Sequence, residues 1–168
     1  MIKKRGQVII TIITASLIIA VYAVIFSYSA MPQAESAVQS MTVTEQIVAT
    51  IEKLFRVDLP FNNSPESIDR LDGVVRKAAH FSEYALLGLL TFVIPLCWHF
   101  KRQSGVVGSF LFVALLAAAD EFHQTFVPGR AGRIADVVLD CCGCLAGIGV
   151  MWVVSNGYER LRRKRHNL

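Results

Sequence analysis

Titratable side chains are concentrated in three short segments of a chain that is otherwise strongly apolar. His80 and Glu83 are three residues apart in the first segment, Asp120 and His123 are three apart in the second, and Asp136 opens the third. On a helix, residues three or four positions apart share a face, so each segment directs its polar groups to one side. A histidine near a carboxylate is the arrangement that general acid/base catalysis uses. These five residues are therefore the catalytic candidates.

Other polar residues in the same segments have the chemistry to hold a ligand. Arg130 follows a Pro-Gly turn and is close to Arg133, and a guanidinium suits bidentate recognition of a phosphate or a carboxylate. The alternative is that both arginines contact lipid headgroups or position the turn. The substrate-binding candidates are Lys77, Glu121, Gln124, Arg130 and Asp140.

A divalent metal is a second interpretation of the two histidines and the carboxylates, because imidazole and carboxylate groups suit zinc, manganese or iron. The spacings His80-x-x-Glu83 and Glu121-x-His123 match no established ligand motif, so acid/base use is favoured and the cofactor is left open. A third interpretation is that the polar groups only join helices, where a hydrogen bond contributes about 0.6 kcal/mol. The four cysteines lie in apolar segments and are interpreted as packing residues.

The composition indicates an integral membrane protein. Hydrophobic residues make up 54% of the 168 residues, and they occur in long blocks, which is unusual for a soluble domain. The net charge of +4 does not indicate nucleic-acid binding, because the basic residues crowd near the chain ends and in one short loop. We expect an all-α membrane domain over residues 1–168. Its four transmembrane helices are predicted at about 8–30, 78–100, 105–127 and 134–154.

The polar stretch 31–77 between the first two spans is predicted to be helical. Thr42-Val-Thr-Glu45 has the pattern of a capping box, which predicts a short helix with Val43 and Ile47 on one side. This helix would either lie on the membrane surface or cover the polar site. A second helix is predicted from Ser64-Pro65-Glu66 toward the membrane. In the fourth span, Gly143 and Gly147 form a GxxxG face suited to close helix packing.

The distribution of charge predicts the orientation of the spans. Four spans bring the basic residues near position 3, near position 101 and in the tail after 159 to one side, and the positive-inside rule makes this side cytoplasmic. Both termini are then cytoplasmic, and the loop 31–77 is extracytoplasmic. The starts of spans two and four and the end of span three fall at the outer leaflet. The ten candidate residues would therefore lie at one depth and could share a cavity.

Asp140 lies about 9 Å along the fourth span from its start, well inside the apolar half-core. A charged side chain at the centre of a span costs about 2.5–3.5 kcal/mol on insertion scales. Asp140 must therefore be paired, hydrated or protonated. Arg130 and Lys77 are its candidate counter-ions, and the sequence does not decide between these states.

Three motifs stand out, namely Lys77-Ala-Ala-His80-Phe-Ser-Glu83-Tyr84, Asp120-Glu-Phe-His123-Gln124-Thr-Phe-Val-Pro128-Gly-Arg130 and Asp136-Val-Val-Leu-Asp140-Cys-Cys-Gly143. With them the chain resembles the VanZ-like family of bacterial integral membrane proteins. The resemblance covers about residues 71–154, and the family often has asparagine at the position of Asp140. It implies a multi-pass protein of the bacterial plasma membrane with four spans. The name-giving member is associated with low-level resistance to teicoplanin, a glycopeptide that binds cell-wall precursors.

The first functional hypothesis is a membrane enzyme that acts at the outer leaflet on an envelope lipid or a lipid-linked cell-wall intermediate. In this hypothesis His80 and His123 exchange protons with the substrate, and Arg130 binds its anionic group. The carboxylates that orient the histidines are Glu83, Asp120 and Asp136. The second hypothesis is a non-catalytic binding or accessory protein of the cell envelope. A small transporter is disfavoured because the polar residues gather at one face. Membrane lipids are the expected partners, and the sequence indicates no oligomeric state.

Overall fold

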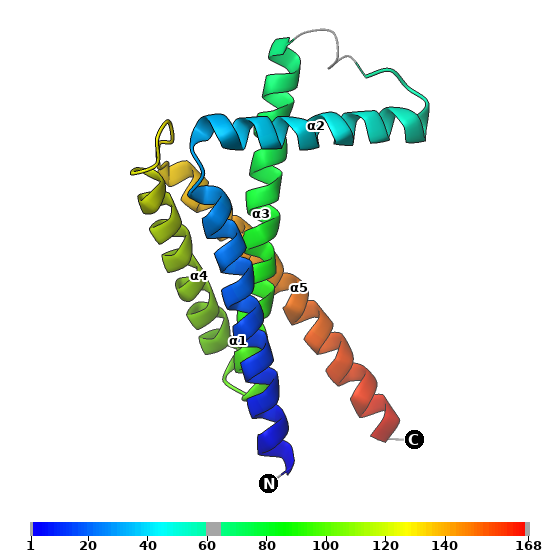
Figure 1. Cartoon of the computed structure of the whole chain (residues 1–168). Coiled ribbons are helices and arrows are strands. Elements are labelled where there is room, and N and C mark those ends of the chain that lie inside the picture. The colour runs from blue at the N-terminus through cyan, green and yellow to red at the C-terminus, as the bar shows by residue number, and fades with distance from the viewer. Residues whose placement is uncertain (1, 60–64, 167–168) are drawn as a thin grey trace.

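The computed structural model describes residues 2–59 and 65–166, and every regular element in them is a helix, as expected from the sequence (Figure 1). Ser64, at which the second helix of the 31–77 stretch was predicted to start, falls outside these residues. The helices are α1 (Ile2–Ser29), α2 (Gln33–Phe55), α3 (Pro65–Cys97), α4 (Arg102–Gln124) and α5 (Ile134–His166).

Four helices are long and apolar enough to cross a membrane, which confirms the predicted number of spans. Their bounds differ from the prediction. α3 begins at Pro65 and continues into the second span as one helix, whereas α4 ends at Gln124 rather than at 127. α5 continues past 154 to His166, because no proline interrupts the basic tail. The segments long and apolar enough to cross a membrane are Lys4–Ser29, Glu66–Cys97, Arg102–Gln124 and Ile134–Arg163.

The closest packing in the bundle joins α3 to α5. A Cβ atom at Gly143 would overlap the backbone carbonyl of Phe81, and one at Gly147 would overlap that of Ala85. The GxxxG face therefore works as predicted, because only glycine lets the two backbones approach this closely. Cys144 is fully buried at the same contact, in agreement with its interpretation as a packing residue.

Side chains on the outer surface of the bundle are largely apolar. Ile19, Leu115 and Val153 are each about 70% exposed, whereas the buried core is small and includes Tyr84 and Phe92. A water-soluble helical bundle buries such residues, so this surface matches a lipid surrounding.

α2 runs crosswise over one end of the bundle, and the first residues of α1 and the last of α5 lie at the other end (Figure 1). The predicted helix start at Thr42 is wrong: α2 begins at Gln33 after Pro32, and the Thr42 hydroxyl donates a hydrogen bond to the Val38 carbonyl one turn earlier. The capping-box pattern thus lies inside a helix that had already begun.

A buried carboxylate fixes α2 to α3. Asp72 on α3 is 3% exposed and accepts hydrogen bonds from the hydroxyls of Ser40 and Thr44, each at 3.0 Å. Arg76 lies one turn further along α3, and its Nε is 3.1 Å from the same carboxylate. Each of the two hydroxyl hydrogen bonds to this buried carboxylate contributes about 1.5–3 kcal/mol. The start of α2 is therefore held firmly above the end of the bundle.

Candidate functional site

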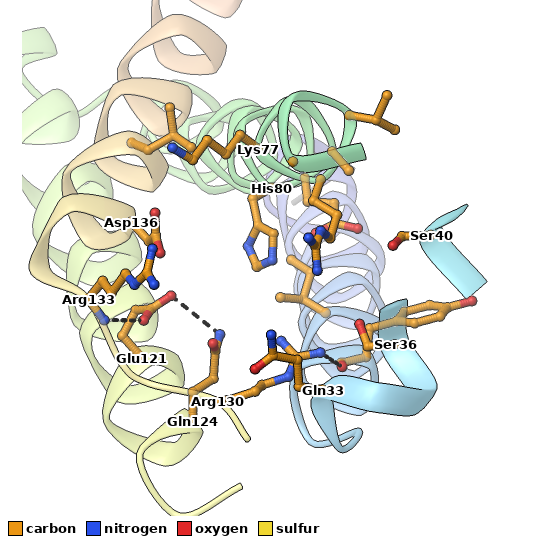
Figure 2. Close-up of a pocket in the computed structure, with 18 of the residues that line it drawn as sticks. Gln33, Ser36, Ser40, Lys77, His80, Glu121, Gln124, Arg130, Arg133 and Asp136 are labelled. Carbon is orange, nitrogen blue, oxygen red and sulfur yellow. Dashed lines mark hydrogen bonds between the residues drawn. The ribbon is translucent and has the colours of Figure 1, made fainter. Parts of the chain in front are cut away.

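A cavity of about 650 Å³ lies at the end of the bundle that α2 covers (Figure 2). Its wall is formed by the end of α1, the first half of α2, one side of α3, the end of α4, the start of α5 and the turn between these last two helices. The ten candidate residues divide into seven that line this cavity and three that do not. The seven are Lys77, His80, Glu83, Glu121, Gln124, Arg130 and Asp136.

His80 stands between the cavity and a buried carboxylate. Its side chain points into the cavity, while its Nδ1 is 3.8 Å from Oδ1 of Asp140 on α5. Asp140 is completely buried, and neither of its carboxylate oxygens has a hydrogen-bond partner among the residues that the structure describes. The side chain therefore does not face lipid. Among the described residues, the His80 imidazole lies against Asp140 in place of the expected Arg130 or Lys77, and the two form an ion pair only when the imidazole is protonated.

A second buried carboxylate lies on α4. Asp120 is completely buried, and its Oδ2 accepts a hydrogen bond from Gln124 Nε2 at 3.2 Å. Its Oδ1 and the hydroxyl of Tyr84, also completely buried, have no hydrogen-bond partner within the described part of the chain. Neighbouring unpaired acceptors and donors in a shielded region are typical of a site that exchanges protons or holds water.

Glu121 connects α4 to the turn before α5. Its Oε2 accepts the Arg133 backbone N–H at 2.8 Å, and its Oε1 accepts Gln124 Nε2 at 3.3 Å. A Cβ atom at Gly132 would overlap the Glu121 carbonyl, so glycine lets the turn lie against the helix. The carboxylate of Glu121 is thereby fixed at the edge of the cavity.

Arg130 uses much of its guanidinium to hold the junction between α1 and α2. Its Nε donates to the Met31 carbonyl and its Nη2 to the Tyr28 carbonyl, both at 2.9 Å. Burial lowers the pKa of Arg130 from its ordinary value, and the charge of Asp120 acts in the opposite direction. Arg130 still lines the cavity, so its positive charge acts on a ligand bound there even though Nε and Nη2 already donate to backbone carbonyls.

His123 lies on a different side of α4 from the cavity-lining residues. Its ring is stacked at a tilt on Phe26 of α1, with 4.5 Å between the ring centres. Together with Asp120 and Asp140, His123 is absent from the described residues that line the cavity. Asp120 and Asp140 lie behind the lining residues Gln124 and His80, whereas His123 packs against α1, and His80 is the histidine that lines the cavity.

Comparison with known proteins agrees with the motifs. The VanZ/LLP1 family model matches residues 14–155 of this chain. The chain belongs to the VanZ-like family. No curated protein and no solved structure gives a significant match. The family match begins within α1 and includes all of α2, so it extends well before the 71–154 region that carries the three motifs.

Several lining residues of this VanZ-like protein were not among the candidates. Arg76 lies four residues before His80, on the same helix face, so helical spacing alone could have indicated it. Ser36 and Ser40 of α2 form the opposite wall, and their helix was predicted to begin only at Thr42. The additional polar lining residues are Tyr28, Gln33, Ser36, Gln39, Ser40, Arg76 and Arg133.

The charged groups around the cavity are of both signs. Arg76, Lys77, Arg130 and Arg133 bring four cations, while the acids come from α3, α4 and α5. In the part of the chain that the structure describes, no group of three or more His, Cys, Asp or Glu side chains is arranged to hold a metal ion. The arrangement suits a ligand that carries a phosphate or carboxylate, with a histidine placed to exchange a proton with it.

Proposed function

We propose that this VanZ-like protein acts in the bacterial plasma membrane on the headgroup of an envelope lipid or a lipid-linked cell-wall intermediate. The observation that carries the proposal is His80, which points into a cavity lined by charges of both signs at the end of a membrane bundle and has the buried Asp140 behind it. The cavity is large enough for a headgroup, since small-ligand sites have volumes of about 300–1,000 Å³.

In this proposal His80 exchanges a proton with the ligand and Asp140 orients the imidazole. A carboxylate beside Nδ1 favours the tautomer that leaves Nε2 available to the ligand. The separation of 3.8 Å is longer than a hydrogen bond, and such catalytic contacts shorten when a ligand is bound. Glu83 and Asp136 are further acid/base groups at the wall, and the cations of Arg76, Lys77 and Arg133 bind the anionic part of the headgroup.

The positions of the basic residues support an outer-leaflet site. Lys4, Arg5 and Lys101 belong to the end of the bundle opposite the cavity, and the tail of α5 adds further basic residues there. By the positive-inside rule that end is cytoplasmic, so the cavity faces the envelope. Glycopeptides such as teicoplanin bind cell-wall precursors, so a change in the supply of a lipid-linked precursor would alter susceptibility to them.

A non-catalytic binding or accessory protein is the second candidate function. It is favoured by Arg130, whose Nε and Nη2 hold backbone carbonyls rather than standing free for a transition state. In that case the cavity recognises an envelope ligand and leaves it unchanged.

Mass spectrometry separates the two functions. Purified full-length protein is reconstituted with an envelope lipid extract, and the lipids are analysed before and after incubation. An enzyme consumes one lipid species and forms another, and His80→Asn lowers the rate by about 100-fold or more, the usual contribution of an acid/base group. His99→Asn is the matched control, because His99 lies in the turn between α3 and α4, at the far end, with a φ of 55° that asparagine tolerates.

Retention of a lipid without turnover would replace the enzymatic proposal with the binding one. Equal turnover by His80→Asn and by wild-type protein would remove His80 from the chemistry.

A further inference from the structure

One side of α2 changes from polar to apolar along the helix. Ser36, Ser40 and Val43 line the cavity from the first half of α2. Ile47 and Ile51 continue this side at spacings of four residues, and Leu54 follows three residues later. At these spacings the six side chains form a single stripe. The side that covers the cavity therefore becomes an apolar surface further along the helix.

Apart from Ser40, which also bonds to Asp72, the contact with α3 uses the adjacent side of α2 and leaves the apolar part of the stripe uncovered. Thr44 and Val48 are buried against α3, where Thr44 bonds to Asp72. Ile47 is 40% exposed and Leu54 is 72% exposed. Figure 1 shows the later half of α2 extending beyond α3, away from the other spans.

Neighbouring residues indicate the depth of α2 relative to lipid. The Gln33 backbone N–H donates to the Pro128 carbonyl at 3.2 Å, so the start of α2 lies at the level of the turn between α4 and α5. On either side of that turn, Phe126 is 71% exposed and Ile134 is 85% exposed. Large apolar side chains exposed at this level match a lipid surrounding, as do those on the outer surface of the bundle. Lipid therefore reaches the level at which α2 runs.

The opposite side of α2 suits water. Glu45 and Lys53 lie there, together with the small Ala49, and all three are exposed. A helix that lies across the end of a span bundle, with an apolar underside and a polar upper side, matches the pattern of interfacial amphipathic helices.

We propose that α2 binds the bilayer surface, with Val43, Ile47, Ile51 and Leu54 at the boundary between headgroups and acyl chains. Its first half then covers the cavity while its second half rests on lipid. The cavity consequently opens sideways to the headgroup layer, between α2 and the bilayer. This placement of α2 does not depend on what the cavity binds.

Site-directed spin labelling tests the placement. The full chain, with Cys97, Cys141, Cys142 and Cys144 replaced by alanine, carries one label at Ile47→Cys or at Ala49→Cys and is reconstituted in phosphatidylcholine–phosphatidylglycerol vesicles. Collisions with oxygen, which concentrates in the bilayer, are compared with collisions with a water-soluble nickel chelate. Position 49 is the matched control because it lies two residues away and on the opposite side of α2.

We expect the label at 47 to collide more with oxygen and the label at 49 more with the nickel chelate. Equal and high nickel access at both positions would overturn the proposal, because α2 would then stand in water. Spectral broadening at 47 that unlabelled protein removes would also overturn it, because a second copy of the chain would then occupy the apolar side. Each labelled variant is first required to melt like the unlabelled chain, so that these outcomes report on folded protein.

Discussion

At the scale of single residues, Asp140 is the most informative position in the chain. Its depth along the fourth span indicates from sequence alone that its carboxyl group must be paired, hydrated or protonated. The structure adds that it is completely buried, next to His80, with both carboxylate oxygens unpartnered among the described residues. Such a carboxylate costs stability, since an unsatisfied buried polar group is unfavourable by about 1–3 kcal/mol. A group retained at this cost is typical of function rather than of packing.

We therefore predict that Asp140→Asn separates stability from function. The substitution keeps the shape of the side chain and removes a buried carboxyl group that has no hydrogen-bond partner among the described residues. The variant protein should therefore melt at or above the wild-type temperature in detergent. Activity or ligand retention should fall, because an amide orients the His80 imidazole differently. Thermal melting and the lipid assay are measured on the same preparation.

The control for this pair of measurements is Asp69→Asn, an exposed aspartate on α3 whose replacement should change neither quantity. A clear drop in the melting temperature of Asp140→Asn would contradict the prediction, since it would mean that the carboxylate stabilises the folded protein.

At the scale of helices, the crossing of α3 and α5 sets the position of the site. His80 belongs to α3 and Asp140 to α5, and they meet because Gly143 and Gly147 let the two backbones touch below them. The close approach could be predicted from the GxxxG spacing. The identity of the facing residues, Phe81 and Ala85, could not, because a sequence motif on one helix does not specify the register of its partner.

Gly147→Ala should separate α3 from α5 and destabilise the protein. The added methyl group would overlap the Ala85 carbonyl, and overpacking of this kind costs about 1–3 kcal/mol. Gly149→Ala is the matched control two residues further along α5, where a Cβ atom meets nothing within 4 Å. It should leave the melting temperature unchanged or raise it, since alanine favours a helix by about 0.5–1 kcal/mol over glycine. Equal melting of the two variants would show that this glycine does not control the packing.

α2 shows where sequence reasoning was insufficient. Thr42 and Glu45 have the local pattern of a helix start, and local patterns do not reveal that a helix has already begun at Gln33 after Pro32. Covering of the polar site by this helix was one of the two placements expected, but the lining residues before Thr42, such as Ser36 and Ser40, were missed for this reason. Its attachment depends on Asp72, a single aspartate in a polar stretch that gives no signal of burial until α2 and α3 are placed together.

At the scale of the whole molecule, the order of the spans explains why residues far apart in the chain surround one cavity. Spans that alternate in direction bring the start of the second, the end of the third and the start of the fourth to the same end of the bundle. The gathering of these helix ends could therefore be predicted from the number of spans. The separation of the ten candidates into seven that line the cavity and three that do not depends on helix rotation, which apolar periodicity specifies poorly when lipid surrounds the bundle.

The orientation of the whole bundle is tested by cysteine labelling in intact cells. In a chain without native cysteines, Ala131→Cys in the turn beside the cavity should react with a membrane-impermeant maleimide added outside. Gln103→Cys at the opposite end should react only after the cells are opened, because the basic residues near it indicate the cytoplasm. The reverse pattern would place the cavity on the cytoplasmic side and rule out action at the outer leaflet.

The central claim is that the cavity takes an envelope lipid, and photo-crosslinking in living cells tests it most directly. Benzoylphenylalanine is placed at Ala79, which lines the cavity, or at Phe122, which is 67% exposed on the outside of α4 beside Glu121. After irradiation, the lipids attached at each position are identified by mass spectrometry. We expect position 79 to capture an envelope lipid or lipid-linked cell-wall intermediate far more often than position 122, which should capture bulk phospholipid. Identical lipid profiles at the two positions would contradict the account.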